Sequence, residues 1–241
     1  MVNTRNIFLL FILFSVLPAN AQTNKKKRKL LGTDTYFGLR YSYTIAGNFI
    51  QKNDVTKQTD SSFYNVKHSS GYLFGAEVRH NFTKYFAIQT GVNFIRRNYD
   101  AFAKITYPYG SSQVTDSNRT TLQFIAYELP VKAMYFIRLS SNIFMNLSAG
   151  PVLEFYPSDI YYEHFYGQRN SWILAALDFD IGWEYRSKNW GTFHIGGGYK
   201  MMFTNMLYVA YTNKNGHRLD YVNMQGNYFS IDLKYYFPID R

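Results

Sequence analysis

The charged residues of this 241-residue chain recur at alternate positions within otherwise apolar segments, as Asp178 and Asp180 do around Phe179. A set of one sign would indicate an ion-selective channel, whereas balanced signs indicate side chains that neutralise one another in a narrow interior. Seven cations and seven anions share the pattern: Arg40, Arg79, Lys132, Arg138, Arg186, Lys200, Lys234, Glu77, Glu128, Glu154, Asp178, Asp180, Glu184 and Asp232. We therefore predict a structural charge network rather than a catalytic centre.

Histidine is the side chain best suited to acid–base or metal chemistry near neutral pH, and the chain has five. His194 lies on the charged face of its segment, whereas His68, His80, His164 and His217 lie in or beside expected connections. No two have the spacing of metal ligands, there is no cysteine, and no nucleophile elbow, phosphate loop or metalloprotease motif occurs. We assign no catalytic, cofactor-binding or metal-binding residue and expect no cofactor.

Aromatic side chains gather in one expected loop, between Tyr156 and Tyr166. Exposed aromatic residues are enriched at binding hot spots, so this loop is the best candidate for recognition of a partner. The same rings would equally suit the headgroup region of a membrane. The residues that carry the recognition hypothesis are Tyr161, Tyr162, His164 and Phe165.

Apolar and polar residues alternate with a period of two from Tyr36 onward, which predicts strands. We expect a bulge or bend at Pro130, which cannot donate a ladder hydrogen bond. Eight segments show the alternation: Phe37–Ile45, Tyr72–Arg79, Phe86–Phe94, Ile125–Arg138, Ile143–Phe155, Ile173–Arg186, Phe193–Phe203 and Phe229–Phe237. Each is long enough for a tilted strand to cross a bilayer.

The connections between these segments alternate between long and short. The short links lie near 82–84, 139–142 and 187–189, and the long polar links near 46–70, 98–120, 156–171 and 205–226. This alternation is typical of barrels with short periplasmic turns and long external loops. The sequence thus predicts an all-β fold: an eight-stranded antiparallel up-and-down transmembrane β-barrel.

A soluble barrel around a ligand would show the same period with its apolar face turned inward. Two features favour an apolar outer face instead. Aromatic residues make up 20% of the chain and concentrate near the ends of the segments, as interfacial girdles do. The balanced charges suit an interior filled with side chains, so we expect a barrel plugged by them, with no aqueous pore.

The N-terminus has the features of an export signal. Arg5 precedes the apolar run Ile7–Leu17, and Ala19 and Ala21 place small residues before a cleavage site, so residues 1–21 are predicted to be a signal peptide. Residues 22–33 would form a basic extension containing Lys25–Lys29, either a solvated tail or a contact for anionic headgroups or an acidic partner. The barrel would span 34–241. Much of the +10 charge lies outside it, so nucleic acid is not an expected partner.

Three short motifs resemble the PorT-type outer-membrane β-barrel family of Gram-negative bacteria. They are Ala126–Lys132, Ser148–Pro151 and Asp180–Tyr185, and the likeness covers roughly 34–237. The resemblance implies a barrel in the cell outer membrane, in contact with its lipids, and a link to the type IX secretion system and its proteins.

The functional hypothesis is a non-enzymatic barrel that serves as an accessory or structural component of outer-membrane transport or protein secretion of the type IX kind. Two alternatives stay open. One is an outer-membrane lipid-modifying enzyme, because small barrels can carry a catalytic site on the lipid-facing wall. The other is an adhesin or simple structural barrel.

Overall fold

The computed structural model describes residues 34–47, 54–58, 62–109, 112–162, 165–187, 189–212 and 218–238. The predicted signal peptide (1–21) and basic extension (22–33) lie outside these ranges, as do His164 and His217, so those predictions stay predictions. Within the described ranges, no helix is long and apolar enough to span a membrane.

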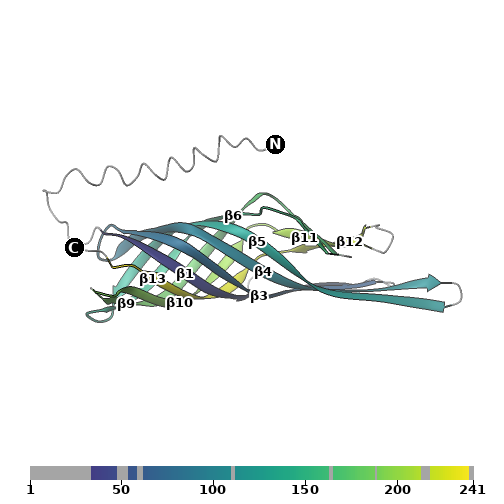
Figure 1. Cartoon of the computed structure of the whole chain (residues 1–241), viewed down its shortest axis with the longest axis horizontal. Coiled ribbons are helices and arrows are strands. Elements are labelled where there is room, and N and C mark those ends of the chain that lie inside the picture. Colours follow the sequence, from purple (N-terminus) through teal and green to yellow (C-terminus); the bar gives the residue numbers. More distant parts are fainter. Residues whose placement is uncertain are drawn as a thin grey trace, which may run out of the picture.

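Eight antiparallel strands close into a barrel (Figure 1). They are β1 (Thr35–Ala46), β3 (Ser62–Asn81), β4 (Phe86–Tyr109), β5 (Ser112–Arg138), β6 (Ile143–Phe155), β9 (Ile173–Ser187), β10 (Gly191–Met202) and β13 (Tyr228–Tyr236). Strand β1 closes the ring because it pairs with β13 on one side and with β3 on the other. Each described strand of the ring is hydrogen-bonded on both sides along at least part of its length, so the barrel has no free edge there.

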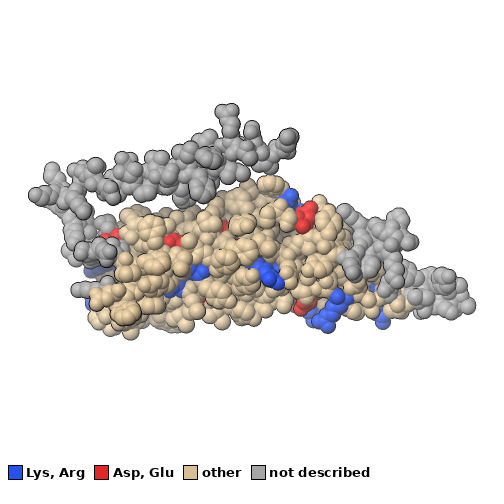
Figure 2. Space-filling view, in the orientation of Figure 1, with Lys and Arg blue, Asp and Glu red and all other residues tan. Residues whose placement is uncertain are grey.

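The predicted eight-stranded transmembrane barrel is confirmed, and its apolar face points outward. In β1 and β9 exposed and buried residues alternate, with Phe37 63% exposed and Trp183 52% exposed. The face shown in Figure 2 consists mainly of uncharged residues along the barrel. Side chains on the other face of each strand fill the interior, as expected for so narrow a barrel.

Short turns join the strands at the end of the barrel where β1 begins and β13 ends. The turn between β3 and β4 is closed by the Phe82 amide, which donates to the Phe86 carbonyl at 3.0 Å. Thr83 Oγ1 accepts hydrogen bonds from the amides of Tyr85 and Phe86. Between β9 and β10 the turn ends at Gly191, whose φ of 79° favours glycine. We call this the short-turn end.

Strands β3, β4 and β5 continue far beyond the opposite end of the barrel, as Figure 1 shows. They have 20, 24 and 27 residues. Strand β2 (Val55–Gln58) pairs with the edge of β3 that faces away from β4. A register shift between Ser69 and Tyr72 marks where β3 leaves the barrel wall. The links near 46–70 and 98–120, which we predicted as loops, are therefore largely strand. We call β2 and the protruding parts of β3, β4 and β5 the extended sheet.

The remaining two long links, near 156–171 and 205–226, also form strands rather than loops. They build a second sheet in the order β12-β11-β8-β7, which we call the capping sheet. Its strands are β7 (Ile160–Tyr162), β8 (Phe165–Arg169), β11 (Leu207–Thr212) and β12 (Arg218–Met224). Strand β11 pairs with β8 and β12, so two distant chain segments form one sheet.

The bulge predicted at Pro130 is absent. Strand β5 runs through this position, and its register with β6 is the same on either side, with Pro130 opposite Val152 and Ala133 opposite Ala149. Proline removes one backbone donor without forcing an extra residue into the strand. The strand therefore continues, as predicted, without a register shift, although its pairing with β6 is interrupted at Val131 and Lys132.

Candidate functional site

The interior of the barrel holds three layers of paired charges. The lower cluster, at the short-turn end, is Arg79, Glu184 and Arg186; the central cluster is Arg40, Glu77, Lys132, Asp178, Asp180, Asp232 and Lys234; the upper cluster is Arg97, Glu128, Glu154 and Lys200. Strict alternation along every strand places these side chains on the inner face. Each strand of the ring supplies at least one of them.

The lower cluster is built around Glu184. Its Oε1 lies 2.5 Å from Arg79 Nη1, and its Oε2 accepts two hydrogen bonds of 3.0 Å from Arg186. The Arg79 guanidinium also stacks 4.1 Å from the Tyr236 ring centroid and 5.3 Å from that of Phe136. These rings replace part of the hydration that a buried guanidinium loses.

The central cluster joins strands that are not neighbours in the barrel. Lys132 on β5 lies 3.0 Å from Asp178 and 2.5 Å from Asp180, both on β9. Arg40 on β1 binds Asp232 on the neighbouring strand β13 at 2.9 Å and lies 3.8 Å from Asp180. One aspartate thus connects cations from distant strands, and removal of a cation would leave buried carboxylates without compensation.

The upper cluster sets two carboxylates side by side. Glu128 and Glu154 stand directly opposite each other on β5 and β6, where like charges repel. Lys200 lies 2.5 Å from Glu128 and 3.2 Å from Glu154, and Arg97 lies 2.8 Å from Glu154. The Tyr156 hydroxyl donates to Glu154 and accepts from Arg97 at 2.8 Å. Two cations therefore neutralise the pair.

Two of the fourteen predicted network positions differ from their expected place. Arg138 is exposed, because it is the last residue of β5 at the short-turn end and its Nε donates to the Ser140 carbonyl. Arg186 is only half-buried. The other twelve are buried. Arg97 was missed, although it continues the inward parity of Gln89 and Asn93 on β4. With Arg97 in place of Arg138 the network still holds seven cations and seven anions.

His194 lies inside the barrel and is buried. Its Nδ1 is hydrogen-bonded to Asn146 Nδ2 at 2.9 Å and lies 4.0 Å from Glu184 Oε1. A lipid-modifying site requires its histidine on the lipid-facing wall, and this one faces away from it. Within the part of the chain that the structure describes, no group of three or more His, Cys, Asp or Glu side chains is arranged to hold a metal ion.

Above the charges, the capping sheet packs on the inner face of the extended sheet. The Tyr64 and Tyr211 rings lie 5.7 Å apart, and a Cβ added to Gly167 would lie 2.5 Å from the Phe124 ring. Met206 connects this apolar core to the upper cluster, because its sulfur accepts hydrogen bonds from Arg97 at 3.7 Å and from the Tyr99 hydroxyl at 3.8 Å. The mouth of the barrel is thus covered by an apolar sandwich.

His68 lies in this sandwich, beyond the outer apolar band that ends near Tyr72 on β3. Its ring stacks on Tyr99 with centroids 4.8 Å apart. Burial, and then the nearby positive charge of Arg97, lower the pKa of His68 to about 4. The imidazole is therefore neutral at physiological pH.

The residues of the predicted recognition loop separate in the structure. Tyr161 is 74% exposed and Tyr162 43% exposed, both on β7. Phe165 does not fit the hypothesis, because it is only 3% exposed and packs edge-on against Tyr211 at 5.2 Å. Across the β7–β8 hairpin Tyr161 stands opposite Tyr166 and Tyr162 opposite Phe165, so Phe165 lies on the face away from Tyr161. The signal for this sandwich was the short alternating run from Leu207 to Tyr211.

A closed antiparallel barrel with an apolar outer wall and an ionised, neutralised interior defines the class of outer-membrane β-barrel proteins. Residues 20–239 match the model of the outer membrane protein beta-barrel domain, and the chain belongs to that family. It is therefore an outer-membrane protein. In barrels of this class the short turns face the periplasm and the longer extensions face the outside.

Among solved structures, the outer membrane protein OprG from Pseudomonas aeruginosa is similar at 10% identity, covering 86% of this chain and 98% of OprG with a TM-score of 0.52. An outer membrane channel from Pseudomonas putida F1 is also 10% identical and covers 90% of this chain and 98% of its own, with a TM-score of 0.28. The OprG likeness supports the fold alone. No curated protein matches this chain.

Proposed function

We propose that this protein is a non-enzymatic, closed barrel that acts as an accessory or structural component of outer-membrane transport or protein secretion of the type IX kind. The observation that carries the proposal is the ionic network, whose thirteen buried members join non-adjacent strands across the interior. An aqueous pathway would leave such side chains hydrated, so the arrangement favours a scaffold over a pore.

The external part supports the same proposal. The extended sheet projects from the membrane on strands of up to 27 residues, and the capping sheet packs against it over a continuous apolar core. A packed projection of this kind can present a defined surface to other secretion components without conducting solutes.

Two measurements test the proposal. In planar bilayers, the purified full-length chain should give no stepwise ion conductance; reproducible single-channel steps would contradict the closed barrel. In a Gram-negative host that carries the gene, its deletion should reduce export of type IX cargo, and re-expression of the chain should restore export. Unchanged cargo export after deletion would remove the secretion role while leaving the closed barrel intact.

A second candidate, an adhesin, is favoured by the exposed rings of Tyr161 and Tyr162. Excision of the whole 156–171 segment cannot test it, because Phe165 belongs to the apolar core. The double substitution Tyr161→Ser, Tyr162→Ser removes the exposed rings only. Reduced attachment of whole cells to a surface, with the amount of folded barrel unchanged, would support the adhesin; equal attachment would argue against it.

A further inference from the structure

The outer wall of the barrel contains an apolar groove of about 700 Å³. Its lining comes from β4, β5, β6, β9, β10 and β13, which are consecutive around the ring. The large outward residues of the lining are partly exposed, such as Phe86 at 54% and Phe179 at 44%. On most of these strands the lining consists of two outward residues and the inward residue between them. The inward residue can line an outer groove only through its backbone, so the strand backbone forms the floor of the groove. The groove therefore opens toward the membrane and not into the interior.

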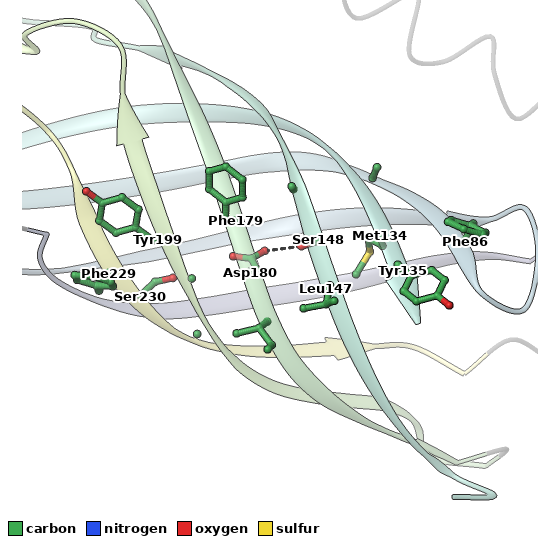
Figure 3. A pocket seen from close by; sticks show the side chains of 15 residues that line it. Phe86, Met134, Tyr135, Leu147, Ser148, Phe179, Asp180, Tyr199, Phe229 and Ser230 are labelled. Atoms are coloured by element: carbon green, nitrogen blue, oxygen red, sulfur yellow. Dashed lines mark hydrogen bonds between the residues drawn. The ribbon is translucent and has the colours of Figure 1, made fainter. Parts of the chain in front are cut away.

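Small residues in two neighbouring cross-strand rows create the hollow. In one row Ala133 and Ala149 stand opposite each other, followed by Phe179. In the next row Tyr135, Leu147 and Ile181 lead to Gly197. The missing side-chain volume is bordered by aromatic rings at both ends. The borders are Phe86 with Tyr135 on one side and Phe179, Tyr199 and Phe229 on the other, as Figure 3 shows.

The groove runs obliquely through the hydrocarbon layer, because its rows cross strands that are tilted in the membrane. Phe86 is the first residue of β4, next to the short turn, whereas Phe229 lies near the start of β13, toward the external end. From Ala133 to Phe229 the rows cross four strand spacings, about 19 Å. One leaflet of the hydrocarbon core is about 15 Å thick, so an acyl chain fits this length.

Two exposed cations lie at the short-turn end of the barrel, close in the chain to the lining residues Phe86 and Tyr135. Lys84, in the turn before Phe86, holds its ammonium 4.7 Å from the Tyr85 ring. The Tyr85 carbonyl accepts a hydrogen bond from the Phe136 amide at 2.8 Å, which fixes this turn beside β5. Arg138 ends the same strand and is also exposed. Cations at this depth meet the headgroup phosphates of the membrane.

We propose that this groove is a binding site for one glycerophospholipid of the periplasmic leaflet. One acyl chain lies across Ala149 and Gly197, and the phosphate is bound near Lys84 and Arg138. The wall is already an interface with hydrocarbon, so the occupant must come from the bilayer. Because both cations lie at the short-turn end, the headgroup is bound at that end of the groove and the lipid belongs to the periplasmic leaflet. The site gives Arg138 a role that the interior network does not.

The test uses the full-length chain in vesicles of phosphatidylethanolamine and phosphatidylglycerol, with a trace of phosphatidylglycerol that carries a diazirine on its acyl chain. After irradiation, mass spectrometry of peptides locates the label. We expect several-fold more label on β5, β6, β9 and β10 than on β3, which over its described residues lines no groove of the outer wall. Even labelling around the barrel would overturn the proposal.

Filling the groove supplies the matched comparison. Ala149→Phe should reduce the excess label on these four strands several-fold, whereas Ala76→Phe, an equally outward position on β3 away from the groove, should leave it unchanged. Ala133→Leu serves as a second, smaller filling variant if Ala149→Phe does not fold. The double variant Lys84→Gln, Arg138→Gln should lower the excess without altering the heat-induced shift of the folded barrel on electrophoresis. Equal losses in the filling variant and its control would refute the site.

Discussion

The barrel and the external sandwich stabilise their interiors in opposite ways. Between the short turns and Arg97 the inward faces carry ion pairs, together with a small apolar cluster of Ala87, Met134 and Phe136. Beyond Arg97 the inward faces of the same β4 and β5 are apolar, with Tyr99, Leu122 and Phe124 all at most 2% exposed. Two neighbouring strands thus change the chemistry of their inner face within a few residues.

The difference follows from what covers each inner face. In the barrel the inner faces meet only one another, across a lumen that long charged side chains can span and pair within. Beyond it, the capping sheet packs on the extended sheet through buried side chains such as Tyr64 and Tyr211, and two packed sheets need interdigitating apolar side chains. Long charged side chains therefore fill the barrel lumen, and apolar side chains fill the space between the two sheets. Substitutions in the two regions should consequently differ in size and in the part of the molecule that they loosen.

The largest effect is expected for Lys132→Met in the central cluster. The substitution keeps the side-chain length but leaves Asp178 and Asp180 without the ammonium that lies within 3.0 Å of both. Removing one partner of a buried ionic network costs about 3–5 kcal/mol. Urea unfolding in lipid vesicles, followed by the heat-induced shift on electrophoresis, should show the whole barrel destabilised.

Arg138→Gln is the matched control, since it removes an exposed cation from the same strand and should change the stability by less than about 0.5 kcal/mol. If both variants unfold at the same urea concentration, the buried network contributes no more to the stability of the barrel than an exposed charge does.

A smaller and more local effect is expected for Leu122→Ala in the sandwich. Leu122 is fully buried on the inner face of β5, and truncation of a buried leucine costs about 2–5 kcal/mol. The loss should fall on the external region, because the ion pairs below it are untouched. Limited proteolysis should cut the external sheets faster while the membrane-embedded part keeps its heat-induced shift.

Gln123→Ala, on the exposed face one residue further along, should leave proteolysis unchanged. Loss of the whole barrel in Leu122→Ala would mean that barrel and sandwich unfold together, against the comparison drawn above.

The barrel was predictable because its inner and outer faces differ in every strand. All eight membrane-crossing segments, their order and the outward apolar face follow from the alternation of residues such as those around Asp180. Arg97 has the same parity but lies beyond Phe94, where the predicted segment ends, whereas β4 continues to Tyr109. Arg138 was misplaced for a different reason. Parity predicts which face of the strand a residue lies on, but not whether other side chains cover that face at the end of the strand.

The sandwich was missed for a different reason. Its strands pair across long sequence separations, as Ala210 does with Tyr166, and polar residues on their outer faces are typical of loops as well. No local pattern states that segments 156–171 and 205–226 meet. Short runs with alternating burial, such as Leu207, Val209 and Tyr211, were the available signal, and they are too short to distinguish a strand from a loop without their partners.

A third effect depends on pH and concerns the sandwich alone. The pKa of His68 is about 4 in the folded chain, below its unfolded value near 6.5, so the unfolded state binds more protons between these limits. The stability that neutral His68 confers is complete above pH 6.5 and falls as the pH drops toward 4, by about 1.4 kcal/mol at pH 5.5.

Proteolysis of the external sheets should therefore accelerate on acidification with an acid-stable protease. His68→Gln should remove this pH dependence in that window, while the barrel in both proteins keeps its heat-induced shift. An unchanged acid response in the variant would assign the titration to another group.

The smallest effect on stability is expected at the outer surface of the capping sheet. The Tyr161 ring is 74% exposed and stacks on Tyr166 at 4.5 Å, so Tyr161→Ser removes one surface contact and no core volume. The change should stay within about 0.5 kcal/mol, measured as the proteolysis rate of the external region. Phe165→Ser, four residues away on the inner face, is the contrasting variant and should destabilise the sandwich by several-fold more. If Tyr161→Ser loosened the sandwich as much as Phe165→Ser, the two faces of the capping sheet would not be the distinct inner and outer surfaces that the burial of Phe165 implies.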